Sequence, residues 1–169
     1  MLSGELVTLR PLTPDDFPAL YAVASDPGIW EQHPASNRHD EAVFREFFKD
    51  ALASGGALAV MDRADGRIIG SSRYHEYDEA RSQVEIGWTF LARSHWGGLY
   101  NGEMKRLMMA HAFRFVRRVL FSVGVNNIRS RMAVERIGGV EIGTQHVAGR
   151  ESVVYAISAE SFADRNRPG

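Results

Sequence analysis

The chain has 169 residues, of which 44% are hydrophobic and 24% charged, proportions that fit one globular domain able to bury its own core. The formal net charge of −1 provides no overall attraction to nucleic acid or to an anionic membrane, so neither is expected as a partner. Because there is no cysteine, the sequence excludes disulfides, thiolate metal sites and a cysteine nucleophile.

Residues 1–12 lack the basic segment and long apolar run of a secretory signal. No stretch of about 18 apolar residues is present that could span a membrane. We therefore expect a cytoplasmic protein that forms a single domain over residues 1–169, with residues 164–169 as a frayed tail.

The first part of the chain predicts one strand and two helices. Residues 2–9 favour a strand, and the sequence TPDD at 13–16 is a strong helix start, with a capping threonine, a proline and two acids. Residues 30–39 are polar around an isolated tryptophan and are expected to form a surface loop. Asp40 then caps a second helix, which the glycines at 55 and 56 end.

The middle of the chain predicts three strands in succession. Residues 57–61 are a short apolar run, and Asp65-Gly66 is a hairpin turn that leads to a partner strand over 68–77. After a polar turn, residues 82–91 alternate between apolar and polar side chains, the period of a strand.

The last third predicts a helix over 100–118, a buried strand over 119–125, a short helix over 128–137, strands over 140–144 and 152–157, and a final helical turn from 158. With no linker and no repeat, this order favours a mixed, largely antiparallel sheet with helices on both faces.

The sequence between the strand at 82–91 and the following helix carries the strongest functional signal. Gly97 and Gly98 lie at the helix start, where free backbone N–H groups and the helix dipole favour an anion. Gly97 and Gly102 have the glycine spacing of a nucleotide P-loop, but Glu103 and Met104 stand where that motif requires lysine and serine or threonine. The dinucleotide fingerprint is also absent. Gly97-Gly98 as an ordinary tight turn remains an alternative.

Taken together, these segments resemble the GNAT acetyltransferases. The matching motifs are WGGLYNGEM at 96–104, NIRS at 127–130 and ERIG at 135–138. The segment TLRPL at 8–12 and VEIGW at 84–88 resemble the opening and fourth strands of the branch that contains the ribosomal-protein N-terminal and spermidine acetyltransferases. The resemblance extends over nearly the whole chain.

This resemblance implies an α/β (α+β) fold with a mixed six- to seven-stranded sheet and a V-shaped splay between strands four and five. It implies acetyl-CoA as the acyl donor and no metal. Pantetheine would pair with the end of strand four, the pyrophosphate would bind the glycine loop and helix start, and the thioester would lie beside the 127–130 segment. The implied cofactor-binding residues are Phe90, Leu91, Ala92, Ser94, Trp96, Gly97, Gly98, Leu99, Tyr100, Asn101, Asn127 and Ser130.

Three positions depart from the family pattern. Ser94 stands where the family's phosphate loop carries glutamine or arginine, although Arg93 is adjacent. Leu99 replaces the last small residue of the phosphate loop, although its side chain could point away while its N–H still donates. Many members of the family place a tyrosine general acid where this chain has Val134. Ser130 is therefore the candidate to protonate the leaving sulfur, with a purely structural role in the short helix as the alternative.

Glu85, on the strand expected to border the cleft, is the candidate general base, acting through water. It could instead hold a cationic substrate or be a solvated strand residue. His75 and Glu76 on the neighbouring strand are weaker candidates of the same kind. The six histidines show no metal-ligand spacing, so no metal site is expected.

The sequence thus predicts an acetyl-CoA-dependent N-acetyltransferase that acts by direct attack of a primary amine. A catalytically weak CoA-binding or scaffolding module is the main alternative, and a nucleotide-binding regulator is a more distant one. The acceptor is left open among a protein N-terminus, a polyamine, an amino acid and an aminoglycoside-like amine, and a homodimer is left open as the oligomeric state.

Overall fold

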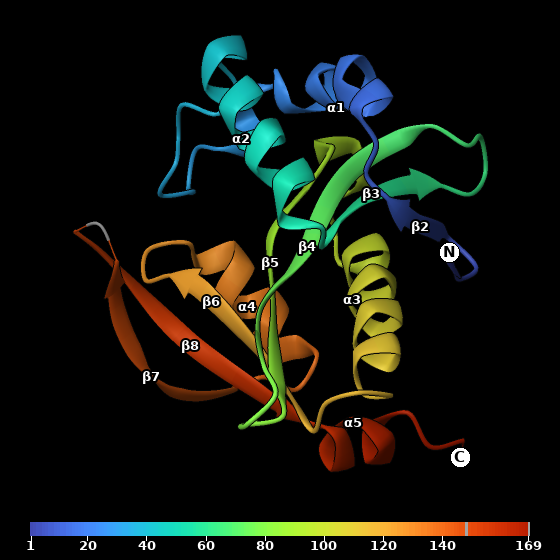
Figure 1. Cartoon of the computed structure of the whole chain (residues 1–169), viewed down its shortest axis with the longest axis vertical. Coiled ribbons are helices and arrows are strands. Elements are labelled where there is room, and N and C mark those ends of the chain that lie inside the picture. The colour runs from blue at the N-terminus through green and yellow to red at the C-terminus, as the bar shows by residue number, and fades with distance from the viewer. Residues whose placement is uncertain (148, 169) are drawn as a thin grey trace.

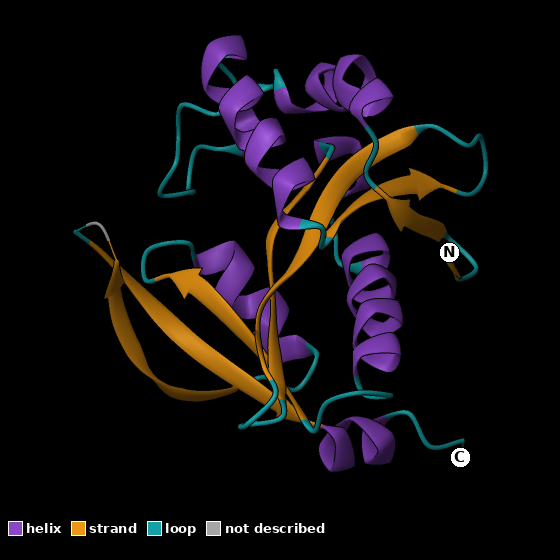
Figure 2. Cartoon of the chain, viewed as in Figure 1, coloured by secondary structure: helices purple, strands orange, loops and turns teal. Residues whose placement is uncertain are grey.

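The computed structural model describes residues 1–147 and 149–168. These residues form five α-helices and one eight-stranded sheet (Figures 1 and 2). The helices are α1 Phe17–Ala24, α2 Glu41–Ser54, α3 Leu99–Ala112, α4 Ile128–Arg136 and α5 Ala159–Arg165. The strands are β1 Leu2–Ser3, β2 Val7–Pro11, β3 Ala57–Asp62, β4 Ile68–Asp78, β5 Gln83–Leu91, β6 Arg118–Gly124, β7 Val140–Val147 and β8 Arg150–Ser158.

The strands lie in the order β1-β2-β3-β4-β5-β6-β8-β7, and every neighbouring pair is antiparallel except β5 and β6. The predicted mixed, mostly antiparallel sheet is confirmed. It has eight strands rather than six or seven because the segment predicted as one strand, 2–9, turns back on itself at Gly4. The Glu103 carboxylate holds this turn by accepting the backbone N–H groups of residues 5–7 at 2.7–2.9 Å.

Helices cover both faces of the sheet, as expected (Figure 1). One apolar core joins the sheet to α3 and α4 through residues such as Met104, Met108 and Val134. A second core, rich in aromatic rings, joins α1, α2 and the 30–39 loop to Phe90 of β5. Trp30 belongs to this second core, and its Nε1 donates to the carbonyl of Ala24 at 2.9 Å.

The predicted cap of α2 is present, whereas the end of α3 differs from the prediction. Asp40 Oδ1 accepts from the N–H of Ala42 at 2.9 Å and starts α2 as expected. The helix predicted over 100–118 stops at Ala112, because the chain leaves it to enter the sheet. There the N–H groups of Arg117 and Arg118 donate to the Ser82 carbonyl at 2.9 and 3.1 Å.

The parallel pairing of β5 and β6 is short. Only residues 83–85 of β5 pair with residues 118–120 of β6, after which β5 continues beside β4 and β6 continues beside β8. The expected V-shaped splay therefore opens directly after Glu85. A V within a sheet exposes backbone groups that would otherwise be paired with the neighbouring strand.

A β-bulge lies on β5 within the open part of the V. Arg73 of β4 pairs with Gly87 and Ser71 pairs with Phe90, so two residues of β5 oppose one residue of β4. Trp88, one of these two, has a φ of 56°, an unfavourable conformation for a bulky side chain. Its indole remains 41% exposed.

The C-terminal segment is helical further than predicted, since α5 continues to Arg165 within the expected tail at 164–169. Gly169 lies outside the described residues. Within the described ranges, no helix is both long and apolar enough to cross a membrane.

Candidate active site

Two adjoining cavities occupy the V between β5 and β6. The first, of about 530 Å³, lies among the end of β5 and the N-terminal ends of α3 and α4. The second, of about 960 Å³, lies among the 30–39 loop, the β4–β5 hairpin and β6. Five residues line both cavities, and we call them the junction: His33, Thr89, Lys105, Asn127 and Ser130.

The N-terminus of α3 forms the outer end of the first cavity. Gly97 and Gly98 have φ angles of 117° and 101°, which require glycine here. The first backbone bond of the helix runs from Gly102 N–H to the Gly98 carbonyl at 2.8 Å, so the N–H groups of residues 99–101 have no helical acceptor. Leu99 itself is 76% exposed. The turn thus offers backbone donors to an anion.

Two cationic side chains of α4 lie close to this end of the cavity. A Cβ at Gly98 would lie 3.0 Å from Nη1 of Arg136, whereas a Cβ at Gly97 would meet nothing within 4 Å. The guanidinium of Arg129 lies 3.7 Å from the ring centroid of Trp96. Positive charge therefore surrounds an open space in front of the helix dipole, an arrangement that suits a phosphate group.

The strand end 90–92 presents only some of its groups to the cleft. Ala92 N–H donates to the Ile69 carbonyl of β4 at 2.8 Å, and Phe90 pairs with Ser71 of the same strand. Because backbone groups alternate between strand edges, those of Leu91 point away from β4. Its carbonyl accepts from Trp96 Nε1 at 2.9 Å, which leaves its N–H to face the cleft.

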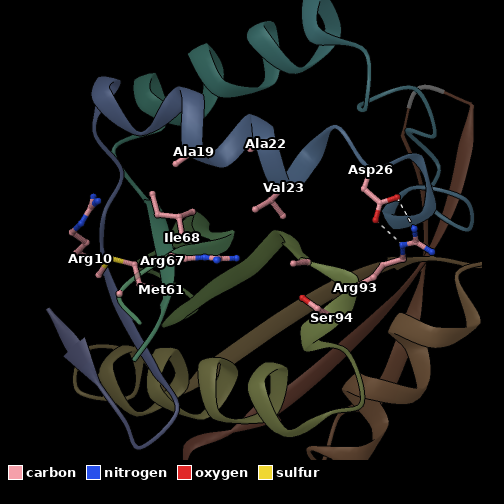
Figure 3. Close-up of a pocket in the computed structure, with 12 residues that line it drawn as sticks. Arg10, Ala19, Ala22, Val23, Asp26, Met61, Arg67, Ile68, Arg93 and Ser94 are labelled. Atoms are coloured by element: carbon pink, nitrogen blue, oxygen red, sulfur yellow. Dashed lines mark hydrogen bonds and ion pairs between the residues drawn. The ribbon is translucent and has the colours of Figure 1, made fainter. Parts of the chain in front are cut away.

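Ala92 and Ser94 are not brought to this cleft. They line a separate groove of about 880 Å³ between α1 and strands β3 and β4 (Figure 3). Ser94 Oγ instead lies 2.8 Å from Nδ1 of His95. The adjacent Arg93 forms a two-pronged ion pair with Asp26 at 2.6 and 2.9 Å, drawn in Figure 3. A cofactor role for Ala92 and Ser94 stays a prediction, and their placement does not favour it.

The groove under α1 is larger than the first cavity, but its charged groups are already paired. Arg10 binds Asp16 at 2.7 Å and Arg93 binds Asp26, while Arg67, which lies 3.7 Å from Asp65, extends into the groove beside small and apolar side chains (Figure 3). The V-shaped cleft, by contrast, gathers helix N–H groups, strand N–H groups and the cations Lys105, Arg129 and Arg136, which form no ion pair within the described residues. We therefore place the candidate site in the cleft.

Asn127 and Ser130 lie at the junction, at the start of α4, and their contact with a cofactor stays a prediction. Asn127 is buried and caps the helix weakly, its Oδ1 accepting from Ser130 N–H at 3.4 Å. Ser130 Oγ makes no hydrogen bond within the described part of the chain. Val134, one turn further on, is fully buried and supplies no hydroxyl where the resemblance implies a tyrosine.

Lys105 is a junction residue that the sequence analysis did not identify. It lies on the buried side of α3 with a side chain only 6% exposed, and its Nζ is 5.4 Å from the ring centroid of Phe121. Burial, and secondarily the charge of Arg129, lowers the pKa of Lys105 from 10.5 to about 8. A signal was available, because the position lies between Met104 and Met108 on a helix whose apolar face was recognised.

His33 is the second junction residue that was not identified. Its Nδ1 accepts a hydrogen bond from Ala35 N–H at 2.9 Å. Burial, followed by the charges of Arg38 and two further arginines, lowers the pKa of His33 to about 4. The ring is therefore neutral at pH 7, and the bond at Nδ1 assigns its proton to Nε2. His33 thus brings a hydrogen-bond donor without a charge.

Glu85 lies at the apex of the V, in the last residue pair before β5 and β6 separate. Its side chain is 13% exposed and lines the second cavity, with Oε1 3.7 Å from Nε2 of His75. Burial outweighs the nearby acids and lowers the pKa of His75, which keeps that ring neutral at pH 7. Glu76 lines the same cavity further along the hairpin. Within the described ranges, no group of three or more His, Cys, Asp or Glu residues is arranged to hold a metal ion.

The fold agrees with comparisons to known proteins. Residues 7–140 match the model of the acetyltransferase (GNAT) domain, so the chain belongs to the GNAT acetyltransferase family. Among solved structures, a GCN5-related N-acetyltransferase from Brucella melitensis is 23% identical, with a TM-score of 0.81 over 95% of this chain and 79% of that one.

Two similar structures are complexes that contain CoA. AAC(6')-Ib, bound to ribostamycin and CoA, is 21% identical, with a TM-score of 0.77 over 97% of this chain and 99% of that one. Spermidine N-acetyltransferase from Vibrio cholerae, bound to CoA and spermine, is 17% identical, with a TM-score of 0.70 over 94% and 99% of the two chains. At these identities the likeness concerns the fold. Family membership supports acyl-CoA-dependent acetyl transfer in general and leaves the amine open.

Proposed function

We propose that this protein transfers an acetyl group from acetyl-CoA to a primary amine by direct attack of the amine. The observation that carries this proposal is the V between β5 and β6, which joins an anion-binding helix start to a second, solvent-open cavity through one junction. A donor with a phosphate end and a reactive end needs such an elongated cleft, and its acceptor needs the second entrance.

The residues present fit CoA at the first cavity. The N–H groups of Leu99, Tyr100 and Asn101 at the start of α3 suit a pyrophosphate, with Gly97 and Gly98 leaving room for it. The N–H of Leu91 suits an amide of an extended arm, in the manner of an added strand. When bound, acetyl-CoA supplies the acetyl group as an activated thioester.

The junction residues have complementary roles in this proposal. His33 Nε2–H donates a hydrogen bond to the carbonyl oxygen on which negative charge develops. Lys105 Nζ holds a proton with a pKa of about 8, close to ~8.5 for a thiol, and can give it to a departing thiolate. Lys105 thereby replaces the hydroxyl that Val134 lacks, with Ser130 Oγ as a second donor. Glu85 accepts a proton from the amine through water.

Calorimetry with acetyl-CoA, followed by thiol release over a panel of amines, tests the proposal. Gly97→Asp should weaken acetyl-CoA binding more than tenfold, about 1.4 kcal/mol, because it adds a negative charge beside the pyrophosphate. Gly66→Asp is the matched control, since Gly66 also has a positive φ (73°) and an open space around its Cβ but lies in the β3–β4 turn. It should leave the affinity unchanged.

Two results would contradict parts of the proposal. Equal acetyl-CoA affinity in folded Gly97→Asp and wild-type protein would remove the helix start as the pyrophosphate site. Tight acetyl-CoA binding without thiol release from any amine would favour the alternative of a CoA-binding module that has lost turnover. A cytoplasmic location and a homodimer remain predictions that these experiments do not address.

A further inference from the structure

A cluster of two arginines and two aromatic rings forms one wall beside the second cavity. The Arg73 guanidinium lies 4.5 Å from the ring centroid of Trp88, and that of Arg38 lies 5.0 Å from the same ring. Both also stack on Phe47, at 5.5 and 4.8 Å. We call these four residues the arginine wall. It comes from three separated segments: α2, the 30–39 loop, and the paired strands β4 and β5.

Arg73 is the buried member of the wall. The residue is only 6% exposed. Its Nε and Nη2 atoms are buried and have no hydrogen-bond partner in the described part of the chain. Contact with a ring offsets only a fraction of the cost of removing a guanidinium from water. Burial lowers the pKa of Arg73, and the charge of Asp50, an exposed residue, opposes this shift. The positive charge of Arg73 is therefore left largely uncompensated behind the surface of the cavity, where a nearby anion would be favourable.

Arg38 is the arginine of the wall that reaches the cavity, which Trp88 also lines. It lines the second cavity and is half-buried. Burial, followed by the charge of Arg73, lowers the pKa of Arg38 to about 10, which still leaves it charged at pH 7. The two guanidiniums repel each other, so an anion bound beside Arg38 would stabilise both positive charges.

The strained conformation of Trp88 places its indole in this wall. The bulge on β5 gives Trp88 its positive φ, and the ring then contacts both guanidiniums while remaining 41% exposed. Backbone strain of this kind costs about 1–3 kcal/mol and is found where a site requires it. The sheet therefore holds a flat, cationic and partly open surface next to the junction.

The acidic residues of the cavity lie further along the hairpin. Arg73 pairs with Gly87, and the pair of His75 with Glu85 follows two residues further along the strands. Asp78 pairs with Gln83 at the far end of the strands. A molecule with one amine and one anionic group would meet charges of the opposite sign at both ends.

We propose that the acceptor is a small amine that also carries a carboxylate, and that Arg38, with the charge of Arg73 behind it, holds this carboxylate. The inference rests on the proposed acetyl transfer. A planar carboxylate matches the two parallel donors of a guanidinium, and stacking on Trp88 and Phe47 fixes the plane of the Arg38 guanidinium. Free amino acids belong to this class, whereas polyamines and aminoglycosides do not.

Binding of product-like probes tests the inference without turnover. With CoA present, N-acetyl-L-alanine and N-acetyl-L-alaninamide are titrated against the protein by NMR. The acid should bind about tenfold more tightly or better, the scale of one charge-assisted hydrogen bond. Arg38→Gln should reduce this ratio to near one, and Arg38→Lys should give an intermediate value. Arg45→Gln should not change it, since Arg45 also stacks on a ring, Phe17, at 4.4 Å but lies outside the cleft.

Thiol release with matched amines provides the second test. Amino acids should have a higher kcat/KM than their amides, and spermidine should be the poorer substrate. Equal binding of acid and amide, a ratio that Arg38→Gln leaves intact, or a preference for spermidine would overturn the inference. A preference for phosphoethanolamine over amino acids would show that the site selects a phosphate, and would overturn the assignment of a carboxylate. Carboxylate-selective binding without thiol release from any amine would support this inference and contradict acetyl transfer.

Discussion

Lys105→Met is expected to make the protein more stable and less active at the same time. Lys105 is buried on α3, and its pKa is lowered from 10.5 to about 8. This difference corresponds to about 3 kcal/mol by which the buried charge destabilises the folded state at pH 7. Methionine fills a similar volume without the charge. For a chain of this size, the gain corresponds to a rise in Tm of about 6–12 °C.

The pH dependence of this gain follows from the direction of the pKa shift. Below pH 8 both the folded and the unfolded states carry the charge, so the penalty is complete. Between about pH 8 and pH 10.5 the folded state has lost the proton while the unfolded state still binds it, so wild-type stability rises with pH. The advantage of Lys105→Met should therefore be largest near pH 7 and vanish above about pH 10.5.

Urea unfolding of both proteins between pH 7 and pH 10.5, without CoA, measures this difference. Lys49→Met is the matched control, because Lys49 is the only other lysine and is exposed on α2. It should change stability by less than about 0.5 kcal/mol. A Lys105→Met variant that is no more stable at pH 7, or whose advantage is the same at pH 10.5, would refute the reasoning. Thiol release should fall in the stabilised variant, which excludes unfolding as the cause.

Three further predictions concern the cleft and its support. Asn127→Ala should raise the acetyl-CoA KM while costing only ~1 kcal/mol as a lost helix cap; a large fall in Tm with normal kinetics would assign Asn127 a structural role alone. Glu85→Gln should slow an α-amine acceptor modestly, with recovery near pH 9 because such an amine has a pKa of ~8; rates equal to wild type from pH 6 to 9 would leave Glu85 as a solvated strand residue. Glu103→Gln should cost about 2–3 kcal/mol at pH 7, because three backbone N–H groups lose their carboxylate. Burial opposes ionisation of Glu103, but these bonds outweigh it and lower its pKa, so the wild-type advantage in urea unfolding should fade as the pH falls through that pKa; an advantage that persists in acid would contradict this assignment.

Local signals in the sequence predicted most of the elements and the position of the helix start at Gly97-Gly98. Caps such as Asp40 and the alternation along β5 depend on neighbouring residues, so they can be read without the fold. The early end of α3 could not be read in this way. It is set by hydrogen bonds from Arg117 and Arg118 to Ser82, more than 30 residues earlier in the chain.

The sequence motifs pointed to candidate site residues that belong to one continuous segment. They did not point to residues that come together only when distant segments fold against each other. The positions of Gly97, Asn127 and Ser130 follow from the resemblance. The burial of Lys105 and the hydrogen bond that fixes the proton of His33 depend on segments far apart in sequence. The hydrogen bond that pairs the Ala92 N–H with β4 likewise depends on a strand more than 20 residues earlier in the chain.

The short pairing of β5 with β6 also has a consequence for cooperativity. Within the described residues, β5 and β6 pair over only three positions, and bonds from Arg117 and Arg118 to Ser82 and Gln83 flank this short seam between the strands β1–β5 and the strands β6–β8. We expect amide hydrogens next to this seam to exchange more readily than those in the middle of either half-sheet. A ligand that bonds to β5 across the V acts as a temporary strand, so its binding should slow exchange on both sides and make the two halves unfold as one unit.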